Sequence, residues 1–543
     1  MRTIYLATVL AASACSSEPK EAPIPPNLEI LSPARSLVQS GAAPVTVTGK
    51  VTPNAQNVPV TQVSVNGVVA NVGADGSFSV PVQIKPGATL LHTEALDANG
   101  GKAQDTRSVE AGDLENPTTM LADAVTTALS KEAFAKISTA AGPIIKGLDM
   151  ASMLAPYQPM VHSGDENGPD CLFGQLYVEN VKMQNIVISM SPTNGGLNFS
   201  AEIDGLDVPG HMTYKVACVG GTDATDVKAT KVVVSGLLKV SPDGQNGFAT
   251  DLQNPNIQIS GLDISSGGVP GAILDIVPID SLIQFIMPKV AGMVMKPMLN
   301  QALGALSGPK TLNLLGKSIT VEVSPSAINF TNDTALVTLD MQMSIGGAEQ
   351  SKFVFTDNGQ PDMDPGQGMQ LGIADDLANS LLSQAVTLGL MNLAMPVTGG
   401  SFDASSIAMT SPPMISASPS DGKMVLVLPD MTSTFTNAGT PVAKAAINAT
   451  VDLQIQPSSD GFGIAIQLGT PNINVDVLPD IANVTGFTPD DLSSAVKLTL
   501  AAQINTVSVL LGGIPLPAIE GIQMKDLSVV GADGYVMVKG ALQ

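Results

Sequence analysis

Few side chains in this 543-residue sequence could carry out chemistry. The three histidines, His92, His162 and His211, are far apart in the chain. The sequence has no G-x-S-x-G elbow, no phosphate-binding glycine loop, no H-E-x-x-H pair and no credible Cys–His pair, which are the patterns that place a nucleophile, a phosphate or a metal. We therefore expect no catalytic residue, no metal, no cofactor and no enzymatic activity.

The first cysteine, Cys15, follows Met1-Arg2, an apolar run over residues 4–12 and two small residues. This order predicts a secretory signal peptide over residues 1–14. The segment resembles a bacterial lipoprotein signal, which implies that Cys15 becomes the mature N-terminus and carries acyl chains. Ser16 then implies the outer membrane, on its periplasmic or surface face. Residues 12–14 also fit the A-x-A site of ordinary signal peptidase, so both processing routes stay open.

The other two cysteines, Cys171 and Cys218, form an even pair once Cys15 is lipidated. In an oxidising compartment such a pair predicts a disulfide, and two buried free thiols are the alternative. Asp357, Asp362 and Asp364 could bind Ca²⁺, but Pro361 and Pro365 interrupt their spacing and a solvated turn fits better.

Composition restricts the class of protein. Hydrophobic residues make up 44% and charged residues 13% of the chain, which excludes a disordered protein. Trp is absent and Met occurs 24 times, so flexible methionines must help fill the interior. The net charge of −23 repels phosphate backbones, and we expect no nucleic-acid partner. The length predicts two or more domains.

A proline-rich segment, residues 15–26, predicts an extended tether, and a small β domain follows it. Residues 27–112 alternate apolar and polar positions, with Asn66-Gly67 as a hairpin turn and Asp75-Gly76 as a second turn. Short strands at this spacing predict a β-sandwich. These motifs resemble bacterial immunoglobulin-like domains, which implies a spacer or adhesive module.

The remainder of the chain predicts helices and strands in turn, in two similar halves, residues 113–310 and 311–543. Helical spacing begins at Leu121, Val125, Ala128 and Leu129 and continues through residues 134–148. The predicted order is completed by strands over 172–264, a helix over 276–306, strands over 319–345, a helix over 373–395, strands over 424–477, a helix over 488–511 and a hairpin over 519–542. The fold class predicted is mainly β with long helices (α+β).

The C-terminal motifs carry a further resemblance. Gly513-Ile-Pro-Leu-Pro517, the two strands after it and Gly368–Ser380 are similar to segments of the bactericidal/permeability-increasing and lipid-transfer protein family. The resemblance implies two pseudo-repeated halves, each a twisted antiparallel sheet wrapped around a long helix. The cysteine positions depart from that family's disulfide, and this acidic chain lacks a basic tip, so lipopolysaccharide neutralisation is not carried over.

The resemblance implies an envelope-anchored carrier of a lipid or other hydrophobic ligand, with the membrane as a second partner through the acyl anchor. Each buried CH₂ of an acyl chain contributes about 0.8 kcal/mol before ordering costs. Core packing is the alternative role for every lining residue, and a structural or adhesive surface lipoprotein is the alternative function. The candidate lining residues are Ile283, Ile286, Met287, Val290, Met293, Val294, Met298, Leu377, Leu381, Val386 and Leu390.

Overall fold

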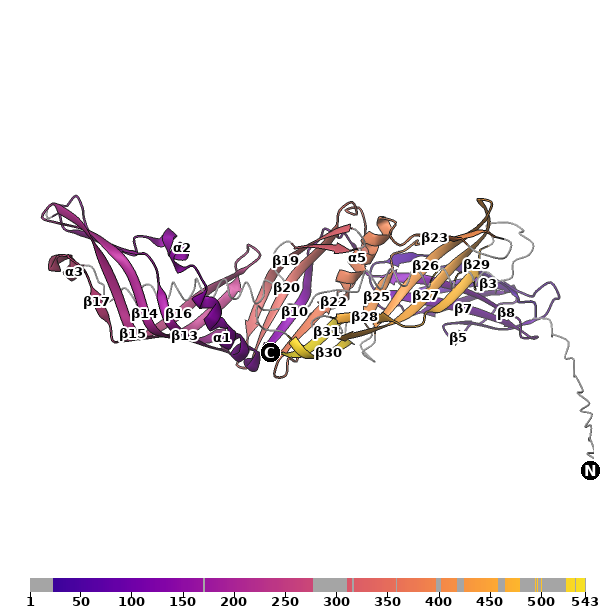
Figure 1. The fold of residues 1–543 in the computed structure, drawn as a ribbon. Helices are drawn as coiled ribbons and strands as arrows, with labels where there is room; N and C mark the ends of the chain where they lie inside the picture. Colours follow the sequence, from indigo (N-terminus) through magenta and orange to yellow (C-terminus); the bar gives the residue numbers. More distant parts are fainter. Residues whose placement is uncertain are drawn as a thin grey trace, which may run out of the picture.

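The computed structural model shows an elongated molecule built mostly of β-strands (Figure 1). One sheet lies at one end, a central sheet follows, and a second end sheet lies beside a small N-terminal module. The structure describes residues 23–168, 171–276, 310–314, 317–357, 359–396, 402–417, 424–457, 464–478, 494, 496, 500, 524–532 and 534–542.

The N-terminal module consists of two sheets with their own apolar core. Asn66 and Gly67, both with positive φ, turn the β4–β5 hairpin as a type I′ turn requires. Alternate residues of its strands point into the core, for example Val63 and Val65. The strands of one sheet are β1 (Asn27–Ser32), β3 (Val45–Thr52) and β6 (Ser77–Val82), and those of the other are β2 (Leu37–Gln39), β8 (Lys102–Ala111), β7 (Gly87–Asp97), β4 (Val60–Val65) and β5 (Val68–Val69).

The first end sheet is antiparallel and contains the longest described strands. Its strands are β11 (Val161–Gly164), β12 (Phe173–Val178), β14 (Gly196–Val216), β15 (Val219–Pro242) and β16 (Phe248–Ser260), with β13 (Lys182–Thr193) on β14 and β17 (Asp263–Ser265) on β15. On β14 and β15 the set of alternate residues that points inward changes at Gly205 and Thr230. Gly205 has a φ of +59° there, so the two paired strands bend together and the sheet curves into a half-barrel.

The central sheet joins strands from distant parts of the chain. In spatial order they are β18 (Lys310–Leu314), β19 (Lys317–Phe330), β20 (Thr334–Ile345), β10 (Leu121–Ser130), β22 (Met369–Ala374), β31 (Tyr535–Leu542) and β30 (Met524–Ala532). The strand β10 corrects our prediction of a helix over 121–129. It pairs with β20 and β22 and is buried on both faces, and a continuous buried run satisfies helical spacing as well as strand spacing.

The second end sheet repeats the plan of the first. Its strands are β23 (Leu393–Pro396), β24 (Ala404–Ala408), β26 (Met424–Asn437), β27 (Thr440–Pro457) and β28 (Ile464–Leu468), with β25 (Met414–Ala417) on β26 and β29 (Asn472–Val477) on β27. A two-stranded sheet pairs β9 (Asp113–Glu115), which directly follows the module in the chain, with β21 (Phe353–Phe355), which lies between β20 and β22 in the chain. One hydrophobic core runs through the three large sheets.

The helices of the described chain are short, and the predicted fold class is wrong in this respect. They are α1 (Lys131–Lys146), α2 (Met150–Leu154), α3 (Gly271–Ile276), α5 (Asp375–Thr387) and the 3₁₀ turn η1 (Ala155–Tyr157). The helix predicted over 373–395 is shortened to the 13-residue α5, because residues 373 and 374 belong to β22, which pairs in the centre of a sheet, and residues 393–395 belong to β23. The described residues therefore form a β-rich protein with half-barrel sheets. They contain no helix with the length and apolarity needed to span a membrane.

Two predicted helices fall partly or wholly on residues that the structure does not describe. The helix over 276–306 lies outside the described residues except at its first residue. In the helix over 488–511, Ser494, Val496 and Leu500 are described and helical. Val496 and Leu500, both part of the predicted apolar stripe, are fully buried in the large core.

The helix α1 shows how a helix is fixed on these sheets. Ser130 caps its N-terminus by accepting a hydrogen bond from the Ala133 amide at 3.1 Å. Inside the helix, Ser138 Oγ accepts a hydrogen bond from the Met190 amide of β13 at 2.9 Å. Gly142 lets the helix approach the same strand, because a Cβ there would lie 2.8 Å from the Ile186 carbonyl oxygen. Pro143 is accommodated within the last turn of the helix.

Candidate functional site

The inner face of the first end sheet carries a row of buried apolar side chains on the longest strands that the structure describes. Its turn at residues 193–196 meets the central sheet, where the Asn194 amide donates to Asn332 Oδ1 at 3.3 Å. From there β14 extends for 21 residues, roughly 70 Å if fully extended. The buried apolar side chains on β14 and β15 are Leu197, Phe199, Ala201, Ile203, Leu206, Val208, Met212, Val227, Ala229, Val232, Val234, Leu238 and Val240.

The described helices cover only part of this face. In the first end sheet α1 packs against β13, and α3 packs against β12 and β14. The 16 residues of α1 are about 24 Å long, roughly a third of the length of β14. The apolar side chains of the inner face of β14 and β15 are buried and form part of the large core. The seven candidate lining residues predicted between Ile283 and Met298 lie outside the described residues.

The four candidate lining residues of the second half lie on or just after α5. Leu377 and Leu381 are buried in the large core, with 2% and 9% of their surface exposed. Val386 and Leu390 are half-buried and pack against the same core. The four residues thus share one apolar environment at the junction of the central and second end sheets.

Polar side chains hold α5 in place, and no motif in the sequence marked them. Asn379 Nδ2 donates to the Ile415 carbonyl at 3.1 Å, and its Oδ1 accepts from the Ile415 amide at 2.7 Å, which ties the helix to β25. Gln384 Oε1 accepts from the Ile345 amide at 2.6 Å and its Nε2 donates to the Met343 carbonyl at 2.9 Å, which ties it to β20. Both side chains are about 1% exposed.

The first turn of α5 contains a buried acid. Asp376 Oδ1 accepts hydrogen bonds from the Thr356 amide at 3.1 Å and from its hydroxyl at 3.3 Å. Burial raises the pKa of Asp376 to about 7, and Asp357 adds to the rise. Near it, Tyr535 donates to the Gly359 carbonyl at 2.6 Å, and burial raises the pKa of its phenol. These groups bond to backbone and to one another, so they act as structural supports for the helix start.

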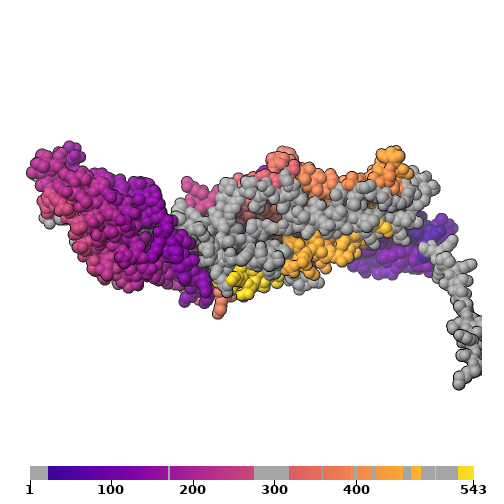
Figure 2. Space-filling view, viewed as in Figure 1, coloured from indigo at the N-terminus to yellow at the C-terminus, as the bar shows by residue number. Residues whose placement is uncertain are grey.

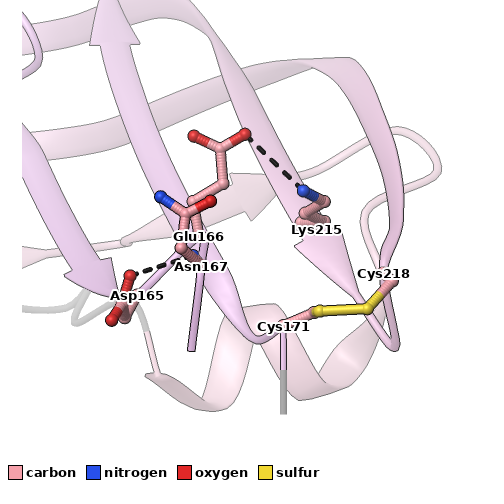
Figure 3. The surroundings of a disulfide bond; sticks show 6 residues. All are labelled: Asp165, Glu166, Asn167, Cys171, Lys215 and Cys218. Atoms are coloured by element: carbon pink, nitrogen blue, oxygen red, sulfur yellow. Dashed lines mark hydrogen bonds and ion pairs between the residues drawn. A yellow bond between two sulfur atoms is a disulfide. The ribbon is translucent and has the colours of Figure 1, made fainter. Parts of the chain in front are cut away.

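The predicted disulfide between Cys171 and Cys218 is confirmed (Figure 3). It joins the turn between β14 and β15 to the segment that precedes β12, and the two Cα atoms are 4.9 Å apart. Beside it, Lys215 Nζ lies 3.7 Å from Glu166 Oε1. Because β14 begins at the central sheet, the bridge closes the opposite end of the first end sheet.

The remaining candidates for chemistry are separated in space. His162 Nδ1 lies 3.1 Å from Gln175 Nε2, and the His211 ring stacks on Tyr177, so these two histidines lie on the first end sheet. His92 is in the module, where its Nδ1 is 2.9 Å from the Thr106 hydroxyl.

The acidic turn contains no assembled ion site. Asp357 accepts from the Gly359 amide at 3.0 Å, and Asp364 pairs with Lys539 at 3.0 Å. Asp362 lies in the same loop as Asp364. No group of three His, Cys, Asp or Glu side chains with the geometry of a metal site occurs among the described residues.

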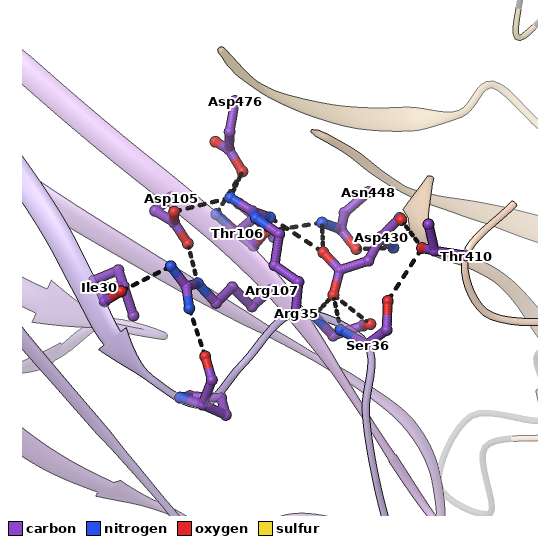
Figure 4. A network of polar contacts seen from close by, with 12 residues as sticks. Ile30, Arg35, Ser36, Asp105, Thr106, Arg107, Thr410, Asp430, Asn448 and Asp476 are labelled. Carbon is purple, nitrogen blue, oxygen red and sulfur yellow. Dashed lines mark hydrogen bonds and ion pairs between the residues drawn. The ribbon is translucent and has the colours of Figure 1, made fainter. Parts of the chain in front are cut away.

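A buried polar network joins the module to the second end sheet (Figure 4). The Arg35 guanidinium lies 2.8 Å from Asp105, 3.1 Å from Asp430 and 3.3 Å from Asp476. Asp430 also accepts hydrogen bonds from the Ser36 amide at 2.6 Å and from the Ser108 amide at 2.9 Å. Figure 2 shows the module, in indigo, lying against the orange strands of the second end sheet.

The sequence carries a weak signal for this network. Asp430 follows Pro429 directly after the apolar run 424–428 of β26, and a proline inside a strand is typical of a bulge. In the structure the pairing of β26 with β27 shifts there, and Asp430 has a φ of +36°. The bulge turns its carboxylate out of the sheet toward the module.

Comparisons with known proteins give weak similarities only. No family model and no curated protein matches the chain. Among solved structures, the chain is weakly similar to a lipopolysaccharide binding protein, with 14% identity over 77% of this chain and 99% of that one and a TM-score of 0.37. It is also weakly similar to P47 from Clostridium botulinum A2, with 9% identity over 77% of this chain and 96% of that one and a TM-score of 0.26. Both TM-scores are below 0.5, so neither similarity is used to assign a fold or a function to this chain.

Proposed function

We propose that this protein is an envelope-anchored carrier of a lipid or other hydrophobic ligand, and that it is not an enzyme. The observation that supports the proposal is the inner face of β14 and β15. Thirteen buried apolar side chains follow these two strands and belong to one continuous apolar interior. The second end sheet offers a similar interior around α5.

The interior is also chemically suited to adaptable apolar contacts. Methionines are buried in all three large sheets, for example Met190, Met343 and Met431. An unbranched thioether changes its rotamer readily, so a methionine-containing interior can accommodate acyl chains of different length and shape. An acyl chain that leaves water for this interior gains about 0.8 kcal/mol for each buried CH₂ before ordering costs.

The first test is native mass spectrometry of the full-length chain with Cys15→Ala, a change that separates bound lipid from any covalently attached acyl group. Stoichiometric phospholipid or fatty acid is the expected result. A folded protein that carries no lipid and takes up none from added vesicles would overturn the proposal. It would favour a structural or adhesive surface lipoprotein instead.

A matched pair of variants then tests the location. Ala229 is 3% exposed on the inner face of β15, and Ala224 is exposed on the outer face of the same strand. Ala229→Phe is expected to reduce bound lipid, because the ring occupies volume on the inner face. Ala224→Phe is expected to leave it unchanged. Equal lipid content in the two variants would place the ligand elsewhere.

A further inference from the structure

The face of the module that meets the second end sheet is unusually rich in carboxylates. Along β8 the side chains of Thr106, Ser108 and Glu110 alternate with residues that point into the module's own core, and all three are buried. They meet β26 and β29 of the body, which contribute Asp430 and Asp476. With Asp105, this interface holds four carboxyl groups against the two guanidiniums of Arg35 and Arg107.

The positive charges do not reach every carboxyl group. Arg107 bonds to Asp105 at 2.9 Å, and Arg35 contacts Asp105, Asp430 and Asp476. Glu110 has no guanidinium beside it, and its neighbours are the Ser411 hydroxyl and the negative charge of Asp430. Its Oε1 is buried without a hydrogen-bond partner in the part of the chain that the structure describes. An ionised carboxylate in such a position is strongly destabilised, whereas a neutral acid is not.

We propose that the module is held on the body by a proton-dependent clasp, in which Glu110 takes up a proton when the module docks and loses it when the module separates. Protonation removes the uncompensated charge of Glu110 in the docked state, and the Ser411 hydroxyl remains a neighbour of the neutral acid. Separation exposes Glu110 to water, where the carboxylate is fully solvated. The clasp sets how firmly the module, at one end of the molecule, is fixed to the elongated body (Figure 1).

The direction of the pH dependence follows from the burial of these groups. Burial raises the pKa of Glu110 from 4.5 to about 7, and the Asp430 charge adds to the rise against the Ser411 hydrogen bond. Burial also raises the pKa of Asp476 to about 7, with Asp105 adding to the rise and with Thr106 and Arg35 opposing it. An acid whose pKa is higher in the docked state favours docking at low pH. Docking is therefore firmest below about pH 4.5, weakens up to about pH 7 and is constant above it.

The other titratable neighbour, His92 on β7, contacts only Thr106 of this network. Its pKa is lowered by burial and by Lys102. Substitution of Glu110 leaves His92 in place, so any contribution of the histidine remains in the variant. For Glu110 alone, the ratio of docked to separated module should fall on the order of fifty-fold between pH 5 and pH 8.

Hydrogen exchange of the full-length protein measures this ratio directly. The Thr106 and Ser108 amides donate across the interface to Asp476 and Asp430, at 2.8 and 2.9 Å, so they are protected only when the module is docked. After correction for intrinsic exchange rates, their protection should fall from pH 5 to pH 8 by at least the factor that Glu110 alone contributes, and Asp476 enlarges this fall. Glu110→Gln should raise their protection at pH 8 and flatten the curve, with Asp476 accounting for the remaining slope. Glu29→Gln removes an exposed charge from the same module, and it should change neither the protection at pH 8 nor the slope of the pH curve.

Flat protection in the unaltered protein, or an unchanged slope in Glu110→Gln, would overturn the clasp. Amides in β4, within the module core, report whether the variant keeps its fold. If it does not, Ser411→Ala provides the second test. Removal of the hydroxyl that favours ionised Glu110 should move the midpoint of the pH curve upward, and an unmoved midpoint would equally overturn the proposal.

Discussion

Asn379 offers the sharpest test of how α5 is held in place. Among the described strands, β25 pairs only with β26, so its other edge needs partners from elsewhere. The side chain of Asn379 supplies them by bonding to both the amide and the carbonyl of Ile415. Asn379→Leu keeps the approximate volume but removes both bonds. Each buried backbone group left unpaired costs about 1–3 kcal/mol, so the loss of both partners should cost the variant about 2–6 kcal/mol of stability.

Two measurements on the full-length protein follow this change. Thermal melting should show a lower midpoint, and hydrogen exchange should show faster exchange in β25, where the Ile415 amide loses its acceptor. Asn256→Leu, an exposed change on β16, is the control and should stay within about 0.5 kcal/mol of the unaltered protein. If Asn379→Leu has the same melting midpoint as the control, the two hydrogen bonds do not hold the helix and the reasoning is refuted.

Three further predictions concern other contacts. Cys218→Ser removes a cross-link between residues 47 positions apart. The unfolded chain then gains conformational entropy, which should destabilise the first end sheet by about 4 kcal/mol. Thermal melting of the variant, compared with the unaltered protein with and without reductant, measures this loss. Gly142→Val forces α1 away from the Ile186 carbonyl and should lower stability by about 1–3 kcal/mol, whereas unchanged melting would show that the helix has room to move. Asp376→Asn keeps an acceptor oxygen for Thr356 and removes a buried charge. It should therefore raise the melting temperature at pH 8 and reduce the fall in stability between about pH 4 and pH 7. An unchanged pH profile of stability would contradict the raised pKa of Asp376.

Local patterns predicted the features that depend on neighbouring residues. Asn66-Gly67 marked a hairpin because both residues tolerate positive φ, and the structure has that turn. The residues Phe134, Ile137 and Ala141 marked one face of α1, and all three are buried. The disulfide was predicted from the even pair that remains after Cys15, together with the redox environment of an exported protein.

The error in fold class came from patterns that two structures share. A strand in the centre of a sheet is buried on both faces, so its residues are uniformly apolar or small and also satisfy the spacing of a helix. Leu121–Ser130 and Met369–Ala374 are such strands. Only their pairing with β20, β31 and each other, between residues at least 161 positions apart (Ala374 with Tyr535), decides that they are strands.

The sequence by itself determined the β-rich composition of the chain, its turns and its cysteine pairing, because each depends on residue type or short spacing. The tertiary structure decided which buried polar groups meet. Arg35 and Glu110 lie more than three hundred residues before Asp430 and Asp476, and no periodicity links the two pairs. Their pKa values and their role at the interface depend on burial and on the partners that folding brings within hydrogen-bond distance.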